Sequence, residues 1–422
     1  MKKNNRTILF LMLSIVSMTV CFVDIPVLTL VIATAVWILI FYKARASIFT
    51  EMSFILLFSY FQGCIHKTIG VVGSTLAWAG VNTPFYFEEL SVATMSFLLT
   101  MLWACWYTRI ISYEKEIYRS SPNITISSAR IFLILAVLIV IAVFPSIPTV
   151  KFSSGGRARN ESLPYGLVLL ALFLVALTFD LCKKHKSFLL VYFFVCFWIV
   201  GHGERVDLLG FFSYAALKFL NEIDFSTVRK KVLRNRKRIV IISAGIVLVV
   251  ALIVGLKRTS SGGTISIGII LKNFIVQPTC GDVVYVYNCS VDMWRNGKLL
   301  NGYTYIDYPL QLIPVTIGNY SLAPFMIKQY HTMGGGLFFT EPMANFGMIG
   351  VFVFNFVFIY VISKIIRKRN KLRNWMFIPI VIEIFRICWY ARAVWILAVF
   401  VEAPIIYLGT KYILKGIKKV KK

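Results

Sequence analysis

The chain has 422 residues, of which 58% are hydrophobic and 15% charged, and its mean hydropathy is +0.77. A soluble globular protein of this size does not need so much apolar surface, so the composition indicates a polytopic membrane protein. The formal net charge is +27. Its distribution, described below, follows membrane topology and argues against nucleic-acid binding.

The N-terminal segment resembles a secretory signal peptide, because MKKNNR precedes the apolar run TILFLMLSIVSMTVCFV. It lacks a small-x-small cleavage site, and Val20 before Cys21 does not fit a lipoprotein signal. We therefore expect this run to be the first transmembrane helix.

Apolar runs long enough to span a bilayer recur along the chain. They show no period-two alternation, which favours helices over a barrel. The predicted fold is an all-α polytopic membrane protein with about twelve transmembrane helices and a large structured outer (periplasmic or extracellular) loop. The runs lie near 7–23, 25–42, 47–66, 90–108, 131–148, 165–182, 187–203, 206–223, 239–256, 343–363, 375–390 and 393–413.

Three segments follow from these spans. Residues 1–256 carry nine helices with short loops, residues 257–342 form the large outer loop, and residues 343–422 carry three helices and a basic tail. If the N-terminus is cytoplasmic, the inner loops and tail hold 31 of the 45 lysines and arginines. This bias predicts that both termini are cytoplasmic.

Two segments on the predicted outer side are basic, although lysine and arginine otherwise concentrate in the inner loops. They are TVKFSSGGRARNESLP (149–164) and the long loop 257–342. The long loop is rich in apolar and aromatic residues, so we expect it to fold as a cap. Cys280 and Cys289 lie nine residues apart in it. They are either a disulfide, if the compartment is oxidising, or two buried thiols. No metal-ligand cluster, nucleotide motif or cofactor motif is present in the sequence.

Ionisable residues between apolar spans are functional candidates because burying them in a membrane is costly. GHGERVDLLG (201–210) carries four of them: His202, Glu204, Arg205 and Asp207. Either this is a solvated hairpin turn, or Arg205 binds an anionic ligand.

A second group lies in IEIFRICWYAR (382–392), where Glu383 and Arg386 are three residues apart on one helical face. They form a buried ion pair, or Arg386 and Arg392 bind an anion. Arg157 and Arg159 of the basic outer loop join this set, since a guanidinium binds two phosphate oxygens at once.

For the other carboxylates in or near the spans, a structural role is one of the interpretations. Glu51 and Glu402 lie in or near spans and are expected to be paired structurally. Glu88 and Glu89 are either an acidic site or a solvated boundary.

The entry to the tenth span, MGGGLFFTEPMANFGMIG (333–350), combines glycines with Glu341, Pro342 and Asn345. Glu341 is either a helix-capping carboxylate or a functional group. Together with Asp307 and His331 it suggests group transfer. A base would take a proton from an acceptor hydroxyl, while arginines stabilise a leaving diphosphate.

On these residues the chain resembles the Wzy-type polysaccharide repeat-unit polymerases. The resemblance rests on GGG…E…NFG..G at 334–350, on GHGERVDL, and on a late arginine-bearing span ending in WYAR. It covers roughly residues 200–395.

The resemblance implies an inverting integral-membrane glycosyltransferase, related in fold to the O-antigen ligase group, in the bacterial cytoplasmic membrane. Such an enzyme transfers the growing glycan from undecaprenyl diphosphate to the non-reducing end of a new lipid-linked repeat unit. Carried over to this chain, Glu341 or His331 would be the base. The diphosphate would be bound by Arg205, Arg386, Arg392, Arg157 and Arg159.

No cofactor or metal is implied. The partners would be the lipid-linked oligosaccharide, membrane lipid, other pathway proteins and a chain-length regulator. The alternatives are a lipid-linked glycan ligase, a flippase of the same pathway, and a transferase using monophosphate-linked sugars. The sequence does not distinguish O-antigen from capsule synthesis or identify the sugar.

Overall fold

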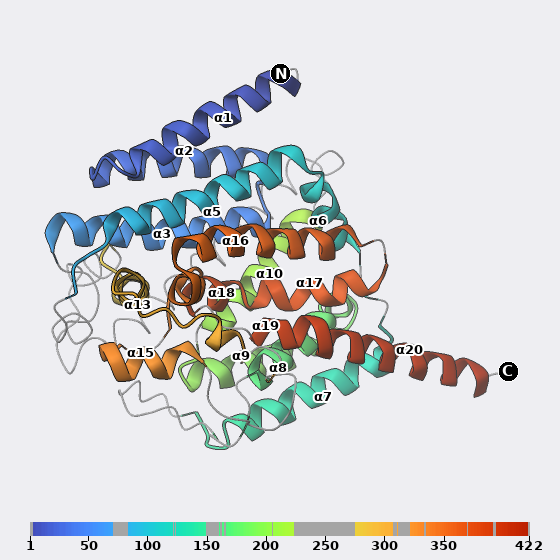
Figure 1. Ribbon diagram of the computed structural model, residues 1–422. Helices are drawn as coiled ribbons and strands as arrows, with labels where there is room; N and C mark the ends of the chain where they lie inside the picture. The colour runs from blue at the N-terminus through green and yellow to red at the C-terminus, as the bar shows by residue number, and fades with distance from the viewer. Residues whose placement is uncertain are drawn as a thin grey trace. The chain divides into compact units, whose positions relative to one another are not determined.

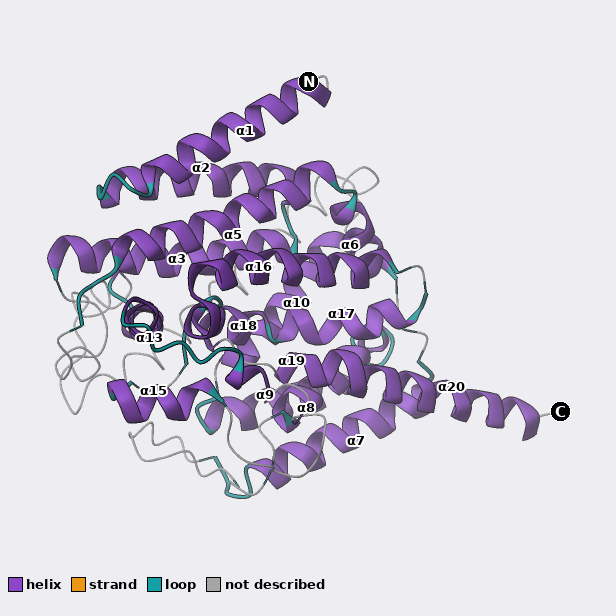
Figure 2. Ribbon diagram, in the orientation of Figure 1, coloured by secondary structure: helices purple, strands orange, loops and turns teal. Residues whose placement is uncertain are grey.

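The structure is a computed structural model. It describes residues 3–70, 83–120, 122, 124–148, 160, 163, 166–204, 206–222, 275–306, 310, 321–332, 335–368, 370–390 and 394–420. These residues form helices and loops, with no strand among them (Figure 2). The predicted all-helical class is therefore confirmed for this part of the chain.

Among the described residues, six stretches of helix are long and apolar enough to cross a membrane: Pro26–Ala44, Ile48–Ile69, Phe87–Tyr107, Ile126–Val143, Thr340–Arg367 and Trp395–Tyr412. Shorter apolar helices accompany them, and the predicted span 239–256 lies outside the described residues. The helices that coincide with the first eight predicted spans and the tenth are α1 (Lys3–Val20), α2 (Pro26–Ala44), α3 (Ile48–Ile69), α5 (Phe87–Tyr107), α7 (Ile126–Val143), α8 (Leu167–Leu177), α9 (Phe188–Gly201), α10 (Val206–Glu222) and α16 (Thr340–Arg367).

Local chemistry explains several helix ends. Pro26 opens α2, where its missing N–H costs nothing. Ser47 caps α3 by accepting a hydrogen bond from the backbone of Phe49, and Gly70 ends that helix at φ +80°. Thr125 caps α7 in the same way as Ser47 caps α3.

The last two predicted spans are interrupted. The run 375–390 was expected to be one helix, but α17 (Leu372–Ile382) ends before Glu383 and α18 (Ile384–Tyr390) follows it. Pro379 in α17 removes a backbone donor just before this break. The final span consists of α19 (Val394–Leu397), a π-helical turn (Ala398–Glu402) and α20 (Ala403–Val420).

The described part of the predicted outer loop is also helical. It contains α13 (Pro278–Arg295), a 3₁₀ turn η2 (Tyr303–Ile306) and α15 (Leu322–Tyr330). α13 packs against α3, α15 and α16 (Figure 1).

The chain divides into two compact units. Unit 1 comprises residues 1–114, 275–367 and 386–393, and unit 2 comprises residues 115–274, 368–385 and 394–422. Both units draw on distant parts of the sequence. The division falls within α6 (Ile110–Arg119) and just before Arg386.

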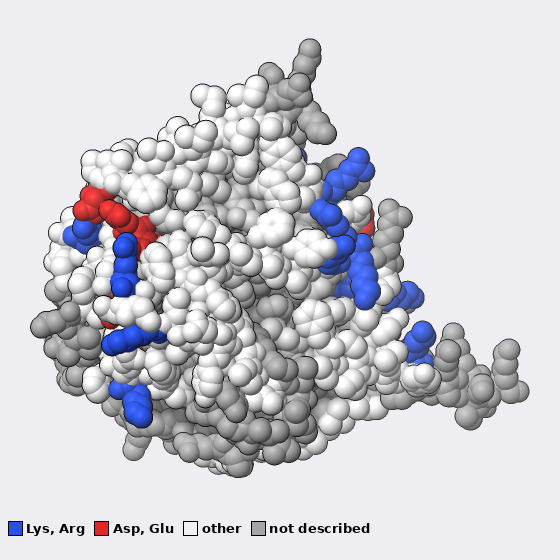
Figure 3. Space-filling view, in the orientation of Figure 1, with Lys and Arg blue, Asp and Glu red and all other residues white. Residues whose placement is uncertain are grey.

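In unit 1, α2, α3, α5 and α16 pack together. The hydroxyl of the buried Tyr60 donates to Thr29 Oγ1 at 2.6 Å and lies 2.9 Å from Ser91 Oγ. This chain of hydroxyls joins α2, α3 and α5 inside an apolar interior. On the face seen in Figure 3, most described side chains are uncharged, and the lysine, arginine and carboxylate side chains gather in small groups.

In unit 2, α10 packs against α17 so closely that any side chain at Gly210 would collide with the Ile382 carbonyl. Lys218 on α10 is 2% exposed, and its ammonium lies 3.1 Å from Asp180 and 3.3 Å from Glu222. The pair with Asp180 ties α10 to the turn that follows α8.

Of the two expectations for Cys280 and Cys289, the disulfide is wrong, because both residues are free, buried thiols. Both residues lie on α13. Nine residues of helix separate their backbones by about 13 Å along the axis, which is beyond the reach of a disulfide.

Candidate functional site

The helix that carries Glu341 is bent. Gly347 interrupts α16 with φ +63° and ψ −154°, so residues 340–346 form a short helical segment set aside from the rest (Figure 1). A Cβ at Gly347 would lie 2.5 Å from the indole nitrogen of Trp294. Both the backbone angle and the indole therefore require glycine at this position.

The bend folds the short segment back onto the main helix. A Cβ at Gly350 would lie 2.5 Å from the carbonyl oxygen of Pro342, eight residues earlier. On a straight helix these residues would be about 12 Å apart along the axis. The glycines of the NFGMIG motif therefore place Glu341, 7% exposed, inside the unit rather than at a solvated helix end.

Asn345 holds this bend. Its side-chain nitrogen donates to Thr304 Oγ1 at 2.7 Å and to the Glu341 carbonyl at 2.8 Å. Its side-chain oxygen accepts from the backbone of Gly302 at 2.9 Å. Asn345 is fully buried and joins the η2 turn to the Glu341 segment. Sequence reasoning noted this residue but gave it no role.

The arginine-bearing helix α18 lies against the glycine-rich segment. The Phe338 N–H donates to the Cys388 carbonyl at 2.9 Å. A Cβ at Gly335 would lie 2.5 Å from the ring of Tyr390. The Arg386 guanidinium stands 5.6 Å from the centre of the same ring. The segment that leads to Glu341 and the helix that carries Arg386 are thus one local structure in unit 1.

Arg386 is held inside the protein. It is 3% exposed, and α18 is tied to α3 by a hydrogen bond of 2.9 Å from the Trp389 indole to Ser59 Oγ. A buried guanidinium is a candidate for binding an anionic group, because its planar fork binds two oxygens of a phosphate at once.

Two buried hydroxyls flank the glycines. Thr332 and Thr340 are 4% and 0% exposed, and neither hydroxyl has a hydrogen-bond partner among the described residues. Buried hydroxyls normally have such partners, so this pair indicates a place for water or for a polar ligand. A side chain at Gly336 would collide with the Thr340 hydroxyl.

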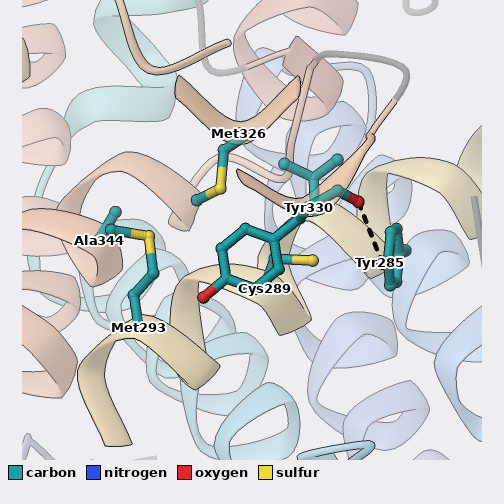
Figure 4. Packing of buried hydrophobic residues seen from close by; sticks show 7 residues of the cluster. Tyr285, Cys289, Met293, Met326, Tyr330 and Ala344 are labelled. Atoms are coloured by element: carbon teal, nitrogen blue, oxygen red, sulfur yellow. Dashed lines mark hydrogen bonds between the residues drawn. The ribbon is translucent and has the colours of Figure 1, made fainter. Parts of the chain in front are cut away.

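His331 is exposed and occupies the left-handed position that ends α15, with φ +51°. The preceding residues anchor α15. Met326 and Tyr330 pack with Tyr285, Cys289, Met293 and Ala344 in a buried cluster (Figure 4). His331 is therefore presented on a fixed helix, and its role as a base stays a prediction.

A polar network links α13 to α5. Asp292 accepts from the hydroxyls of Tyr86, at 3.0 Å, and Tyr330, at 2.9 Å. Burial raises the pKa of Tyr330, and the neighbouring Asp292 carboxylate raises it further. These tyrosines therefore stay protonated donors.

The Arg295 guanidinium donates to Glu89 Oε1 at 2.8 Å from Nε. Glu89 is buried, so it is not the solvated boundary residue that was one expectation from the sequence. The Glu89 carboxylate is the main reason that the pKa of Arg295 is raised.

The reading of 201–210 as a solvated turn is also wrong for its described residues. His202, Glu204 and Asp207 of unit 2 are 8%, 2% and 1% exposed. The His202 ring nitrogens lie 2.7 Å from the Trp198 carbonyl and 3.0 Å from the Ser146 carbonyl. Burial of this kind depends on tertiary packing, which the local sequence does not reveal.

The remaining predicted site residues, Arg157, Arg159, Arg205, Arg392 and Asp307, lie outside the described residues. Within the described part of the chain, no group of three or more histidine, cysteine or carboxylate side chains is placed to hold a metal ion. No protein-family model, curated protein or solved structure matches the chain.

Proposed function

We propose that this chain is an integral-membrane glycosyltransferase that polymerises undecaprenyl-diphosphate-linked oligosaccharide repeat units in surface polysaccharide synthesis. In this proposal it has about twelve spans in the bacterial cytoplasmic membrane, with both termini cytoplasmic. The segment 257–342 then forms the outer cap. The apolar helices and the resemblance described above support this placement.

The observation that carries the proposal is the packing of the Glu341 segment against the Arg386 helix. Repeat-unit transfer needs a base beside the acceptor hydroxyl and a cation beside the leaving diphosphate. A buried carboxylate and a buried arginine come here from two segments joined by backbone and ring contacts.

In the proposed reaction, Glu341 takes the proton of an acceptor sugar hydroxyl. The hydroxyl oxygen forms a bond to the anomeric carbon of the donor glycan, from the side opposite the diphosphate. The bond from that carbon to the diphosphate oxygen breaks, and undecaprenyl diphosphate leaves with the electron pair. Arg386, with Arg205, Arg392, Arg157 and Arg159, stabilises the charge that develops on it.

Deleting the gene and separating the surface glycolipid on a gel tests the proposal. We expect the ladder to collapse to carrier with a single repeat unit. Loss of every repeat unit would instead indicate a ligase or a flippase, and these differ in whether long polymer accumulates on its lipid carrier. An unchanged ladder would overturn the glycan assignment.

A further inference from the structure

A pocket of about 240 Å³ lies in unit 1 between the η2 turn and α15. Its lining includes Tyr303, Thr304, Ser321, Phe325 and Lys328. We propose that this pocket is a binding subsite for a sugar unit that carries an acidic group. The inference rests on the proposed function for its biological meaning, and it names a substrate class that the proposed function leaves open.

The walls of the pocket offer aromatic surface. Tyr303 is 51% exposed and Phe325 is 37% exposed, so each ring presents part of its surface. The C–H face of a pyranose packs against such rings, while its hydroxyls point to the edges. Ligand sites of this type combine apolar walls with a few fixed polar groups.

The fixed polar group is the Thr304 hydroxyl. Thr304 is 1% exposed, and its oxygen accepts the hydrogen bond from Asn345. Its own proton is donated to no described residue, so it can be donated to a sugar hydroxyl. Asn345 also donates to the Glu341 backbone carbonyl. A sugar bound to Thr304 would therefore be linked to the Glu341 segment through the Asn345 side chain.

The positive charge of Lys328 favours an acidic ligand in this pocket. Lys328 lines the pocket and forms no ion pair with any described residue. Arg295 of the same unit differs, since Glu89 neutralises it. An ammonium beside aromatic walls, with no ion-pair partner among the described residues, favours a sugar with a carboxylate or phosphate substituent over a neutral sugar.

Saturation-transfer NMR on the full chain in phosphatidylcholine nanodiscs tests this site, with glucuronate and glucose as probes. We expect signals from both probes, stronger for glucuronate. Phe325→Ala should weaken both signals about 3- to 10-fold, as loss of one aromatic contact predicts. Lys328→Gln should remove the advantage of glucuronate, a change of about threefold at an exposed charge.

Lys298→Gln is the matched control, because Lys298 is an exposed lysine of the same unit outside the pocket. Melting temperatures equal to wild type show that the variants are folded. Equal signals from wild type and Phe325→Ala would overturn the subsite. A glucuronate advantage that survives Lys328→Gln would overturn its acidic specificity.

The two proposals fail separately. An unchanged ladder in the deletion strain would overturn the polymerase assignment while probe binding still establishes a sugar site. A collapsed ladder with no pocket-dependent probe binding would leave the polymerase assignment and remove the subsite.

Discussion

The backbone N–H of Phe338 donates to the carbonyl of Cys388 at 2.9 Å, across fifty residues of sequence. This bond fixes the glycine-rich segment that leads to Glu341 against the helix that carries Arg386. The close contact between Gly335 and the Tyr390 ring reinforces it. The proposed chemistry depends on this relationship, because base and cation must keep a fixed geometry.

Replacing Glu341 by Gln removes the proposed base but keeps the size and shape of the side chain. We expect polymerisation to fall about 10²- to 10⁴-fold, the usual contribution of a general base. Polymer formed from radiolabelled lipid-linked repeat measures the change. Glu88→Gln, at an exposed glutamate of unit 1, is the control. Wild-type polymer from Glu341→Gln would show that another group, such as His331, is the base.

Replacing Arg386 by Lys keeps the charge but removes the planar guanidinium. We expect kcat to fall about 10²-fold with a smaller change in KM, because the group acts on charge that develops in the transition state. Initial rates at several repeat-unit concentrations separate the two constants. Arg109→Lys, at an exposed arginine, should change neither constant. A rise in KM alone would assign Arg386 to substrate binding rather than to leaving-group stabilisation.

Replacing Gly347 by Ala tests the bend in α16. Alanine at φ +63° is strained, and its Cβ would collide with Trp294, so we expect a loss of about 2 kcal/mol in unfolding free energy or failure to fold. Gly409→Ala is the matched control, since Gly409 lies in α20 with nothing near its Cβ position. That change should leave stability unchanged or raise it by about 0.5 kcal/mol. Thermal unfolding in detergent measures both variants, and equal melting temperatures would exclude the bend.

The cysteines of α13 should be free and unreactive. Burial raises the pKa of the Cys289 thiol to about 12, and burial likewise raises that of Cys280. At pH 8 only about one Cys289 thiol in 10⁴ would be ionised, and the thiolate is the reactive form. We expect N-ethylmaleimide to spare both residues until the protein is unfolded in SDS, as read from labelled peptides. A peptide pair lighter by two hydrogens would reveal a disulfide and contradict the single-helix geometry.

Apolar run length predicted long helices such as α5, since a segment that spans a membrane must be helical to satisfy its backbone. The bend at Gly347 was missed because it depends on contact with a distant residue, Trp294. The break at Glu383 was missed although Pro379, inside the predicted span, is a local signal for it. The burial of Glu89 was missed because its partner Arg295 is more than two hundred residues away. The local signal for the bend was Asn345 followed by the glycines of NFGMIG.

The central claim is that the Glu341 segment and the Arg386 helix form one transferase site. The most direct test adds purified chain in nanodiscs to the lipid-linked repeat unit isolated from its own deletion strain. Mass spectrometry then follows lipid-linked dimer and released undecaprenyl diphosphate. We predict that wild type releases one undecaprenyl diphosphate for each glycosidic linkage it forms in dimer and longer products. Glu341→Gln and Arg386→Lys should give neither product above a few per cent of wild type. Full activity in both variants, or no dimer from folded wild-type protein that binds the repeat, would contradict the account.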